Sequence, residues 1–134
     1  MLGGDISNKT VPTVLVRMED TLIKDVSKPI FGLKLRQPKY VFEEHTLAMI
    51  IRLSMKTHYK VSLVCYPENY KHFKDLLDGV NIPFSELMYH GDQTITNFLN
   101  CGVYFCYIDE NSDRILKVNH KSCYSVAEFT NLVL

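Results

Sequence analysis

The stretch TVLVRMEDTLIKD, residues 13–25, joins a strand pattern to a cluster of polar side chains. Its first residues are β-branched or leucine, which is typical of a strand buried on both faces of a parallel sheet. The apolar run ends in RMEDT, residues 17–21, so an arginine, two carboxylates and a hydroxyl follow it directly. Ligand sites of open α/β sheets lie at the carboxyl ends of the strands. These residues are therefore the first candidates for a functional site.

The rest of the chain alternates helix-like and strand-like segments. Apolar spacing predicts a helix over 42–57, a helix from Pro67 to about Gly79, a short helix capped by Asp92 and closed by Gly102, and a last helix with a Ser125-x-x-Glu128 capping box. Strands are predicted at 60–66, 84–90 and 103–108. The RILKVN segment, residues 114–119, fits either a strand or part of a helix, and we favour a strand.

This order predicts an α/β fold: a single Rossmann-like domain over 12–134, with a mostly parallel sheet and helices on both faces. Only a flap, at about 23–39, and one helix fit between the first two strands, so we expect no large cap domain. Within the flap, PIFGLKLR could form a small hairpin. The polar residues 1–11 have no signal-peptide pattern, and we expect a flexible N-terminus.

Composition narrows the function classes. The chain has 134 residues, 46% apolar and 22% charged, with 15 basic and 15 acidic side chains. This balance gives no basic excess for nucleic acid, and no apolar run approaches the ~20 residues of a membrane span. The four cysteines form no C-x-x-C pair and the five histidines no H-E-x-x-H motif. We therefore expect a cytoplasmic protein with reduced thiols and no zinc site.

Polar residues also follow the later predicted strands. Cys65 ends the second strand, and HGD, residues 90–92, follows the third. DENSD, residues 109–113, follows the fourth and carries three carboxylates. Carboxylates at the end of a buried strand are costly unless they are paired, hydrogen-bonded or bound to a cation. The carboxyl edge of the sheet is thus the predicted functional edge.

In their order and spacing these residues resemble the haloacid dehalogenase (HAD-like) superfamily of phosphatases, and most closely its small nucleotidase and polynucleotide 3′-phosphatase branch. The first motif of that family, Asp-x-Asp-x-Thr, aligns in register with RMEDT, residues 17–21. YFCYIDENSDRI, residues 104–115, is similar to the fourth motif, and LRQPKYVFEEHTLAMIIRL, residues 35–53, is similar to the helix that follows the flap. The resemblance covers about residues 12–133.

The resemblance assigns roles to positions at the strand ends. The family's nucleophilic Asp aligns with Arg17, which can be neither a nucleophile nor a metal ligand. The family's general acid and base aligns with Glu19, and its strand-two hydroxyl aligns with Cys65. The phosphate-binding lysine has no counterpart, because no lysine lies between Lys74 and Lys117.

The remaining assignments concern phosphate and metal. If a phosphate binds, the resemblance implies contacts with Arg17 and Thr21. In the family, Mg²⁺ is held by the first Asp, a backbone carbonyl and the fourth-motif acids, here Asp109 and Asp113. We expect this metal site to be lost, with Arg17 in the place of the metal and paired with Asp109, Asp113 or Glu19. If the protein is an active enzyme, Glu19 and Asp109 would be its catalytic residues.

Our leading hypothesis is a catalytically inactive HAD-like protein, needing no cofactor, that acts as a binding or regulatory module through contacts with a protein partner. Reduced domains of this kind are known from phage and mobile-element genomes. Three alternatives stay open: an active Mg²⁺-dependent phosphatase or nucleotidase, a phosphate or nucleotide receptor, and an unrelated α/β domain. Tyrosines near predicted element ends are candidates for a contact surface: Tyr40, Tyr59, Tyr66, Tyr70 and Tyr89.

Overall fold

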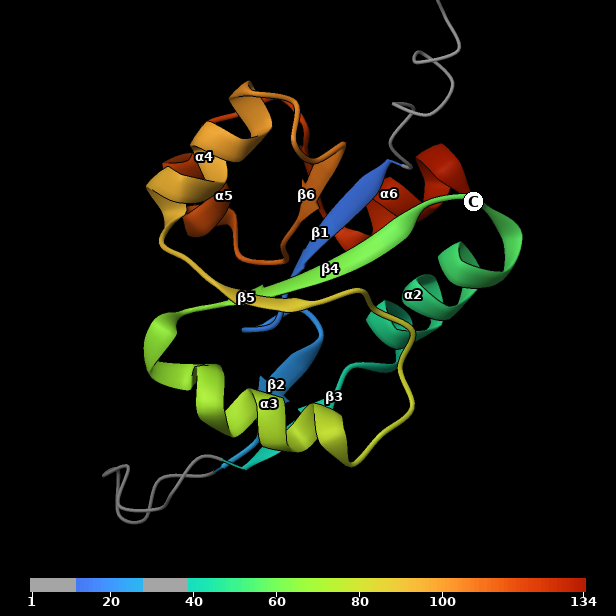
Figure 1. The fold of residues 1–134 in the computed structure, drawn as a ribbon, viewed down its shortest axis with the longest axis vertical. Helices are drawn as coiled ribbons and strands as arrows, with labels where there is room; N and C mark the ends of the chain where they lie inside the picture. The colour runs from blue at the N-terminus through green and yellow to red at the C-terminus, as the bar shows by residue number, and fades with distance from the viewer. Residues whose placement is uncertain (1–11, 28–38) are drawn as a thin grey trace, which may run out of the picture.

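The computed structural model describes residues 12–27 and 39–134, which form one α/β domain (Figure 1). Its strands are β1 (Thr13–Arg17), β2 (Ile23–Asp25), β3 (Tyr40–Phe42), β4 (Lys60–Cys65), β5 (Leu87–Tyr89), β6 (Cys106–Ile108) and β7 (Cys123–Tyr124). The described residues also form five α-helices: α2 (Glu44–Lys56), α3 (Tyr70–Asp78), α4 (Asp92–Asn100), α5 (Ser112–Val118) and α6 (Val126–Val133). A short 3₁₀ turn, Pro67–Asn69, leads into α3.

The predicted parallel sheet is confirmed. Five strands pair in the order β5-β4-β1-β6-β7, and every pairing is parallel. From β1 the chain first builds outward through β4 and β5, and it returns to the other side of β1 for β6 and β7. The carboxyl ends of β1 and β6 therefore lie at a point where the strand order reverses, which is where open α/β sheets bind ligands.

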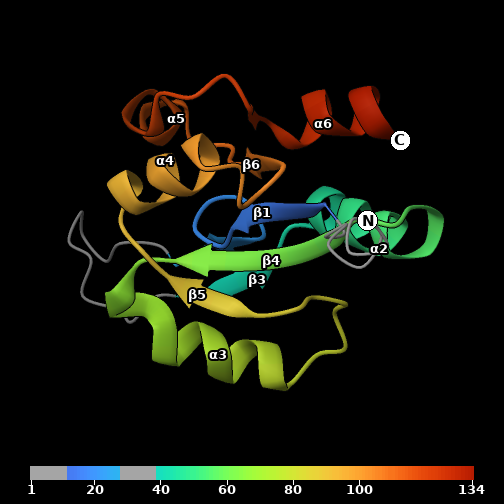
Figure 2. The same ribbon diagram turned by 45° about the horizontal axis from the view of Figure 1, so that its top comes forward.

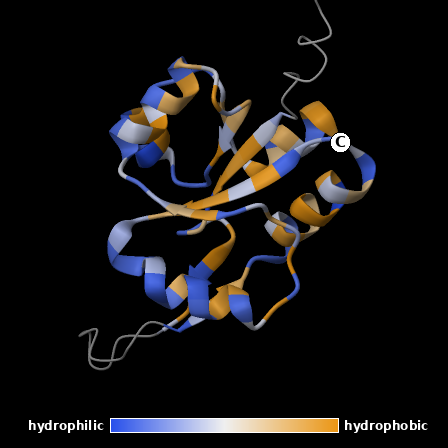
Figure 3. Cartoon of the chain, viewed as in Figure 1, coloured by the Kyte–Doolittle hydropathy of each residue, from blue (hydrophilic) through white to orange (hydrophobic). Residues whose placement is uncertain are grey.

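Helices cover both faces of the sheet. Alternate residues of β1 point to opposite sides, so Val14 and Val16 pack in one core and Leu15 in the other. The first core includes side chains of α2, α3 and α6, and the second includes side chains of α4 and α5. Figure 2 shows α4 and α5 together on one side of the sheet and α3 on the other. Figure 3 shows the apolar residues concentrated in the strands and on the inner faces of the helices.

A tight turn connects β1 to the flap strand β2. The backbone N–H of Leu22 donates to the carbonyl of Arg17 at 3.3 Å, and that of Ile23 donates to the carbonyl of Met18 at 3.0 Å. Asp20 lies in this turn with φ of 60°, a conformation that Asp tolerates better than most residues. β2 then pairs with β3 in an antiparallel hairpin. The predicted PIFGLKLR hairpin, within 28–38, and the predicted flexible residues 1–11 lie outside the described residues.

Two predicted strands are corrected by the structure. Residues 114–118 belong to helix α5 and Asn119 is its C-cap. The Asn111 side chain accepts from the Arg114 N–H at the start of the helix, and Asn119 ends it in the left-handed conformation. The predicted strand 103–108 is strand only over Cys106–Ile108.

The helix ends agree with the predictions in one case and differ in another. Gly91, not Asp92, is the N-cap of α4, and Asp92 lies in its first turn. The Ser125–Glu128 capping box of α6 is confirmed, with both reciprocal hydrogen bonds present. In the part of the chain that the structure describes, no helix has the length and apolar character that a bilayer crossing needs.

Candidate functional site at the carboxyl edge of the sheet

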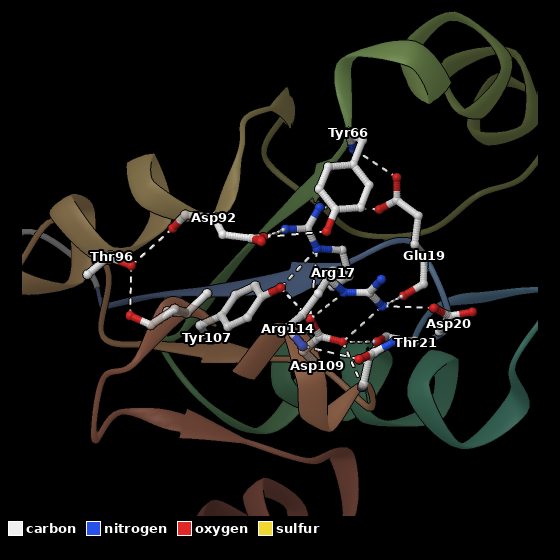
Figure 4. A network of polar contacts seen from close by, with 12 residues as sticks. Arg17, Glu19, Asp20, Thr21, Tyr66, Asp92, Thr96, Tyr107, Asp109 and Arg114 are labelled. Atoms are coloured by element: carbon white, nitrogen blue, oxygen red, sulfur yellow. Dashed lines mark hydrogen bonds and ion pairs between the residues drawn. The ribbon is translucent and has the colours of Figure 1, made fainter. Parts of the chain in front are cut away.

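A polar network lies where β1, β4 and β6 end (Figure 4). Parallel pairing brings Arg17 of β1 level with Val64 of β4, and Val16 level with Ile108 of β6. Arg17 therefore lies level with Asp109, the residue that directly follows the end of β6. The turn after β1 adds Glu19, Asp20 and Thr21, and the starts of α4 and α5 add Asp92 and Arg114.

Arg17 is fully buried at the centre of this network. Its Nε donates to the Tyr107 hydroxyl at 2.9 Å, and its Nη1 donates to Glu19 Oε1 at 3.3 Å. The guanidinium lies over the Tyr66 ring, 4.6 Å from the centroid, in a cation–π contact. Its Nη2 lies 3.7 Å from Asp92 Oδ1 and has no hydrogen-bond partner within the described residues. Arg17 thus connects β1 to β6, to the residue that follows β4 and to the start of α4.

The neighbours of Arg17 keep it charged. Burial alone would lower the pKa of the guanidinium. Tyr107, Glu19 and Asp109 act in the opposite direction, and together they raise the pKa above its ordinary value. Asp109 contributes only through space, because its Oδ2 is 4.0 Å from Arg17 Nε. The result is a permanent buried cation at the end of β1.

A second guanidinium, that of Arg114, lies against Asp109. Arg114 Nε donates to Asp109 Oδ2 at 2.9 Å, and Nη2 donates to Oδ1 at 3.2 Å. The same Nη2 donates to the backbone carbonyl of Glu19 at 2.9 Å and to Asp20 Oδ2 at 3.0 Å. Burial tends to lower the pKa of Arg114, but the hydrogen bonds and charges of Asp109 and Asp20 raise it. The contact of Arg114 with both oxygens of Asp109 is the two-point geometry in which arginine binds a carboxylate most strongly.

The carboxylate of Asp109 is fully occupied by protein donors. Besides Arg114, its Oδ1 accepts from Thr21 Oγ1 at 3.3 Å and from the Asn111 N–H at 2.9 Å. Its Oδ2 also accepts from the Tyr107 hydroxyl. A carboxylate offers about four lone-pair positions, so little acceptor capacity remains for a further ligand.

Glu19 is held in a similar way. Its Oε2 accepts from the Tyr66 N–H and from Asn69 Nδ2, both at 2.8 Å. Its Oε1 accepts from Arg17. The side chain is 12% exposed, and these three contacts fix its position. Glu19 thus links the end of β1 to the loop after β4 through hydrogen bonds.

The structure brings together four of the predicted site residues: Arg17, Glu19, Thr21 and Asp109. Cys65 is buried beside them, and burial, with a smaller contribution from Glu19, raises the pKa of its thiol to about 12. Asp113 lies apart from the network.

Asp113 occupies the exposed first turn of α5. It has no hydrogen bond or ion pair to any residue within 12–27 and 39–134. Asp109 therefore belongs to the Arg17 network and Asp113 does not, although both belong to the segment that resembles the fourth motif.

Three members of the network were not predicted: Tyr107, Asp92 as an ion-pair partner, and Arg114. Tyr107 occupied an apolar run, where an aromatic ring is expected in the core, and nothing in the sequence signalled its polar contacts. Arg114 was hidden by the strand interpretation of 114–119. In a helix that begins at Ser112, its side chain can reach back to the end of β6.

The chemistry of the site is dominated by two cations among acids. Arg17 and Arg114 face four carboxylates, those of Glu19, Asp20, Asp92 and Asp109. Among residues 12–27 and 39–134, no three His, Cys, Asp or Glu side chains converge in a way that could hold a metal ion. The acids are instead arranged around guanidinium groups.

Comparison with models of protein families, with curated proteins and with solved structures found no match to this chain. The parallel sheet, in the order β5-β4-β1-β6-β7, is compatible with a Rossmann-like core, including that of HAD-like proteins.

Proposed function

We propose that this chain is a HAD-like domain without phosphatase chemistry, and that it acts as a binding or regulatory module. The observation that carries the proposal is the contact of Arg114 with both oxygens of Asp109, beside a buried Arg17 at the end of β1. These two cations engage the carboxylates that phosphoryl-transfer chemistry would need free.

The position of the nucleophile supports the proposal first. A guanidinium is never deprotonated in a protein and has no lone pair to attack phosphorus. Arg17 also cannot swing aside at low cost, because its Nε and Nη1 are hydrogen-bonded and the side chain is fully buried. The acid that would carry the phosphoryl group is therefore replaced by a fixed cation.

The residues present do not fit a magnesium ion. In HAD-like enzymes the ion is held by a backbone carbonyl after the first strand and by acids after the fourth. Here Arg114 Nη2 contacts the Glu19 carbonyl and the Asp109 carboxylate, 2.9 and 3.2 Å away. Arg17, which the sequence predicts in the place of the metal, has its Nε 4.0 Å from Asp109, so the contacts favour Arg114 for that place. Arg114 in the place of a bound metal ion would account for the acidic side chains that are still present at the strand ends.

The electrostatic cost of adding a metal is large. At about 4 Å and an effective dielectric near 20, two unit charges interact by ~4 kcal/mol. A divalent ion near Asp109 would meet this repulsion from Arg17 and more from Arg114. The phosphate-receptor alternative meets the opposite difficulty, since an anion at Arg17 would lie among the carboxylates of Glu19, Asp92 and Asp109.

A contact surface at the opposite edge of the sheet fits the binding role. Tyr59 and Phe105 stack with ring centroids 5.2 Å apart, just before β4 and β6 begin. Phe105 is 46% exposed and Val103 is 55% exposed. We name these three residues the amino-edge patch. Aromatic side chains are enriched at protein interfaces. A partner bound at this patch would not contact the buried network, which lies at the other end of the strands.

Phosphate release tests the loss of chemistry. The chain is assayed with nucleoside monophosphates and with p-nitrophenyl phosphate, in Mg²⁺ and in EDTA, beside an identically prepared Asp109→Asn variant. We expect no release above the protein-free blank. EDTA-sensitive release that Asp109→Asn abolishes would refute the proposal and make the domain a phosphatase.

Comparative capture tests the binding role. The immobilised wild type, Phe105→Ser and Leu116→Ser chains are compared in cell extract, because Leu116 is 74% exposed on α5, outside the patch. A protein retained by the wild type and by Leu116→Ser but lost with Phe105→Ser supports the amino-edge patch. Equal retention by all three chains would exclude it.

A further inference from the structure

A groove lies between α2 and α6, and it shares one lining residue, Asp20, with the Arg17 network. It encloses about 550 Å³, within the usual size range of small-molecule sites. α2 contributes His45, Thr46, Ala48, Met49 and Arg52, and α6 contributes Val126, Ala127, Thr130 and Asn131. Asp20, Lys24, Glu43 and Glu110 close the end nearest the carboxyl edge of the sheet.

Small side chains keep the groove open. Ala48 on α2 and Ala127 with Thr130 on α6 line it, and a larger residue at any of these positions would extend into the space. Met49 and Val126 are buried and form an apolar floor. α2 begins beside the turn after β1, because the Glu43 N–H donates to the Leu22 carbonyl. α6 begins beside the loop after β6, because the Val126 N–H donates to Glu110 Oε2.

Most charges around the groove are already paired. Lys24 Nζ lies 2.9 Å from Glu43 Oε2, and Arg114 Nη2 lies 3.0 Å from Asp20 Oδ2. Within 12–27 and 39–134, Glu110 and Arg52 are the lining residues of opposite charge that have no ion pair. The Glu110 carboxylate uses Oε2 to cap α6 and has Oε1 left to accept.

These two charges lie at different ends of the groove. Glu110 is beside the first turn of α6, at the carboxyl edge of the sheet. Arg52 lies further along α2, about 9 Å beyond Thr46 at a rise of about 1.5 Å per residue. The groove therefore has an acidic end, an apolar middle and a basic end.

From this arrangement we propose that the groove binds an elongated small molecule with an apolar body, a cationic group at one end and an anionic group at the other. Its cationic group contacts Glu110 and its anionic group contacts Arg52. This site goes beyond the proposed function and does not depend on it, because neither the Glu110 carboxylate nor the Arg52 guanidinium is hydrogen-bonded or ion-paired to the Arg17 network within the described residues.

Titration of the nitrogen-15-labelled full chain tests the proposal with four probes. ω-Aminooctanoate carries both charges on a long apolar chain, octylamine and octanoate carry one each, and ω-aminobutyrate carries both on a short chain. We expect ω-aminooctanoate to shift the amide signals of α2 and α6. It should bind up to about five-fold more tightly than octylamine or octanoate, the upper end for a single exposed ion pair. It should also bind more tightly than ω-aminobutyrate, which lacks the long apolar chain.

Variants assign the two ends. Arg52→Gln is expected to remove the advantage of ω-aminooctanoate over octylamine, and Glu110→Gln is expected to remove its advantage over octanoate. Ala127→Leu fills the groove and is expected to abolish binding without lowering the melting temperature. Lys56→Gln and Glu86→Gln remove exposed charges outside the groove, so they should leave binding unchanged.

Two results would overturn the proposal. One is a failure of all four probes, at millimolar concentration, to shift the amide signals of α2 and α6. Equal affinities of the four probes that Ala127→Leu does not alter would count in the same way. The other is concentration-dependent association of the chain, measured by sedimentation, that Ala127→Leu abolishes, because the groove would then be an interface between copies. Neither result bears on phosphate release, so the test of the proposed function stays separate.

Discussion

Arg114 lies against Asp109 with its Nε 2.9 Å from Oδ2 and its Nη2 3.2 Å from Oδ1, so one guanidinium contacts both oxygens of one buried carboxylate. Asp109 is fully buried and Arg114 is 8% exposed. The same Arg114 reaches the carbonyl of Glu19, and it thereby ties the start of α5 to the turn after β1. Arg114 thus both occupies the Asp109 carboxylate and links the start of α5 to the turn after β1.

Removing the arginine alone is expected to be severe. Arg114→Leu leaves the Asp109 carboxylate buried without its main partner, and breaking a buried pair in this way costs about 3–5 kcal/mol. Urea denaturation followed by circular dichroism measures the loss in the free energy of unfolding. The double variant Asp109→Asn, Arg114→Leu is expected to recover part of it, because no unpaired charge remains.

An exposed ion pair provides the matched control. Lys24 Nζ contacts Glu43 Oε2 at 2.9 Å, but the lysine side chain is 54% exposed. Lys24→Gln is therefore expected to cost far less than Arg114→Leu, because solvent screens an exposed ion pair. A cost for Arg114→Leu as small as that of Lys24→Gln would mean that Asp109 does not need its arginine.

The hydroxyl of Tyr107 should carry its own share of stability. It accepts from Arg17 Nε and donates to Asp109 Oδ2, so Tyr107→Phe leaves two buried charged groups one hydrogen bond short. The expected cost is about 1–3 kcal/mol in the same denaturation measurement. Tyr104→Phe is the control, since the Tyr104 hydroxyl donates to the sulfur of Met88 and to no charged group among the described residues. Equal costs for the two variants would contradict a bridging role for Tyr107.

The strand ends could be predicted because each follows an apolar run of β-branched residues. The run before Arg17 and the run before Asp109 both marked buried parallel strands, and parallel strands bring their carboxyl ends to one edge. The convergence of Arg17, Glu19, Thr21 and Asp109 follows from that rule alone. Their hydrogen-bond partners do not, since spacing along one chain carries no information on side-chain direction in three dimensions.

Helix α5 shows where a pattern gave too little information. Ile115, Leu116 and Val118 made residues 114–119 resemble a strand, but Leu116 is 74% exposed. The decisive signals were polar: Asn111 caps the helix and Asn119 ends it in the left-handed conformation. A strand over 114–119 gives no reason to bring Arg114 back to Asp109, so the second cation of the site was not predicted.

The two arginines should differ in how they exclude magnesium. If Arg114 occupies the place of the cation, Arg17→Asp alone should not create a metal site. The double variant Arg17→Asp, Arg114→Ser frees Asp109 and adds a carboxylate at the end of β1. We expect only the double variant to gain stability with Mg²⁺, by more than about 1 kcal/mol near saturation. Thermal unfolding with and without Mg²⁺, at matched ionic strength, measures the gain.

Arg114→Ser by itself is the control for that experiment, because it removes the second cation and keeps Arg17. It should show no gain, since the buried Arg17 still repels the ion. If Arg17→Asp alone responds to Mg²⁺ as strongly as the double variant, Arg17 is the residue that excludes the metal, and our assignment of Arg114 is wrong.

Alkaline pH should weaken the fold through its buried thiols. Burial raises the pKa of Cys106 from its ordinary value of 9.0 to about 12, and the Cys65 pKa is raised to about 12 as well. Between those values the unfolded chain loses these protons while the folded chain keeps them, so the free energy of unfolding falls as the pH rises from about 9 to 12. Between pH 8 and pH 10 each thiol should contribute a loss of about 1 kcal/mol.

Urea denaturation at pH 8 and pH 10 isolates this contribution. Cys106→Ala is expected to lower the free energy of unfolding at both pH values because of the space that the sulfur leaves. The fall in that free energy between pH 8 and pH 10 should be about 1 kcal/mol smaller than in the wild type. Cys101 is exposed, so Cys101→Ala should leave the difference as it is in the wild type. An unchanged difference in Cys106→Ala would show that lysine or tyrosine titration, rather than the buried thiols, accounts for the alkaline loss.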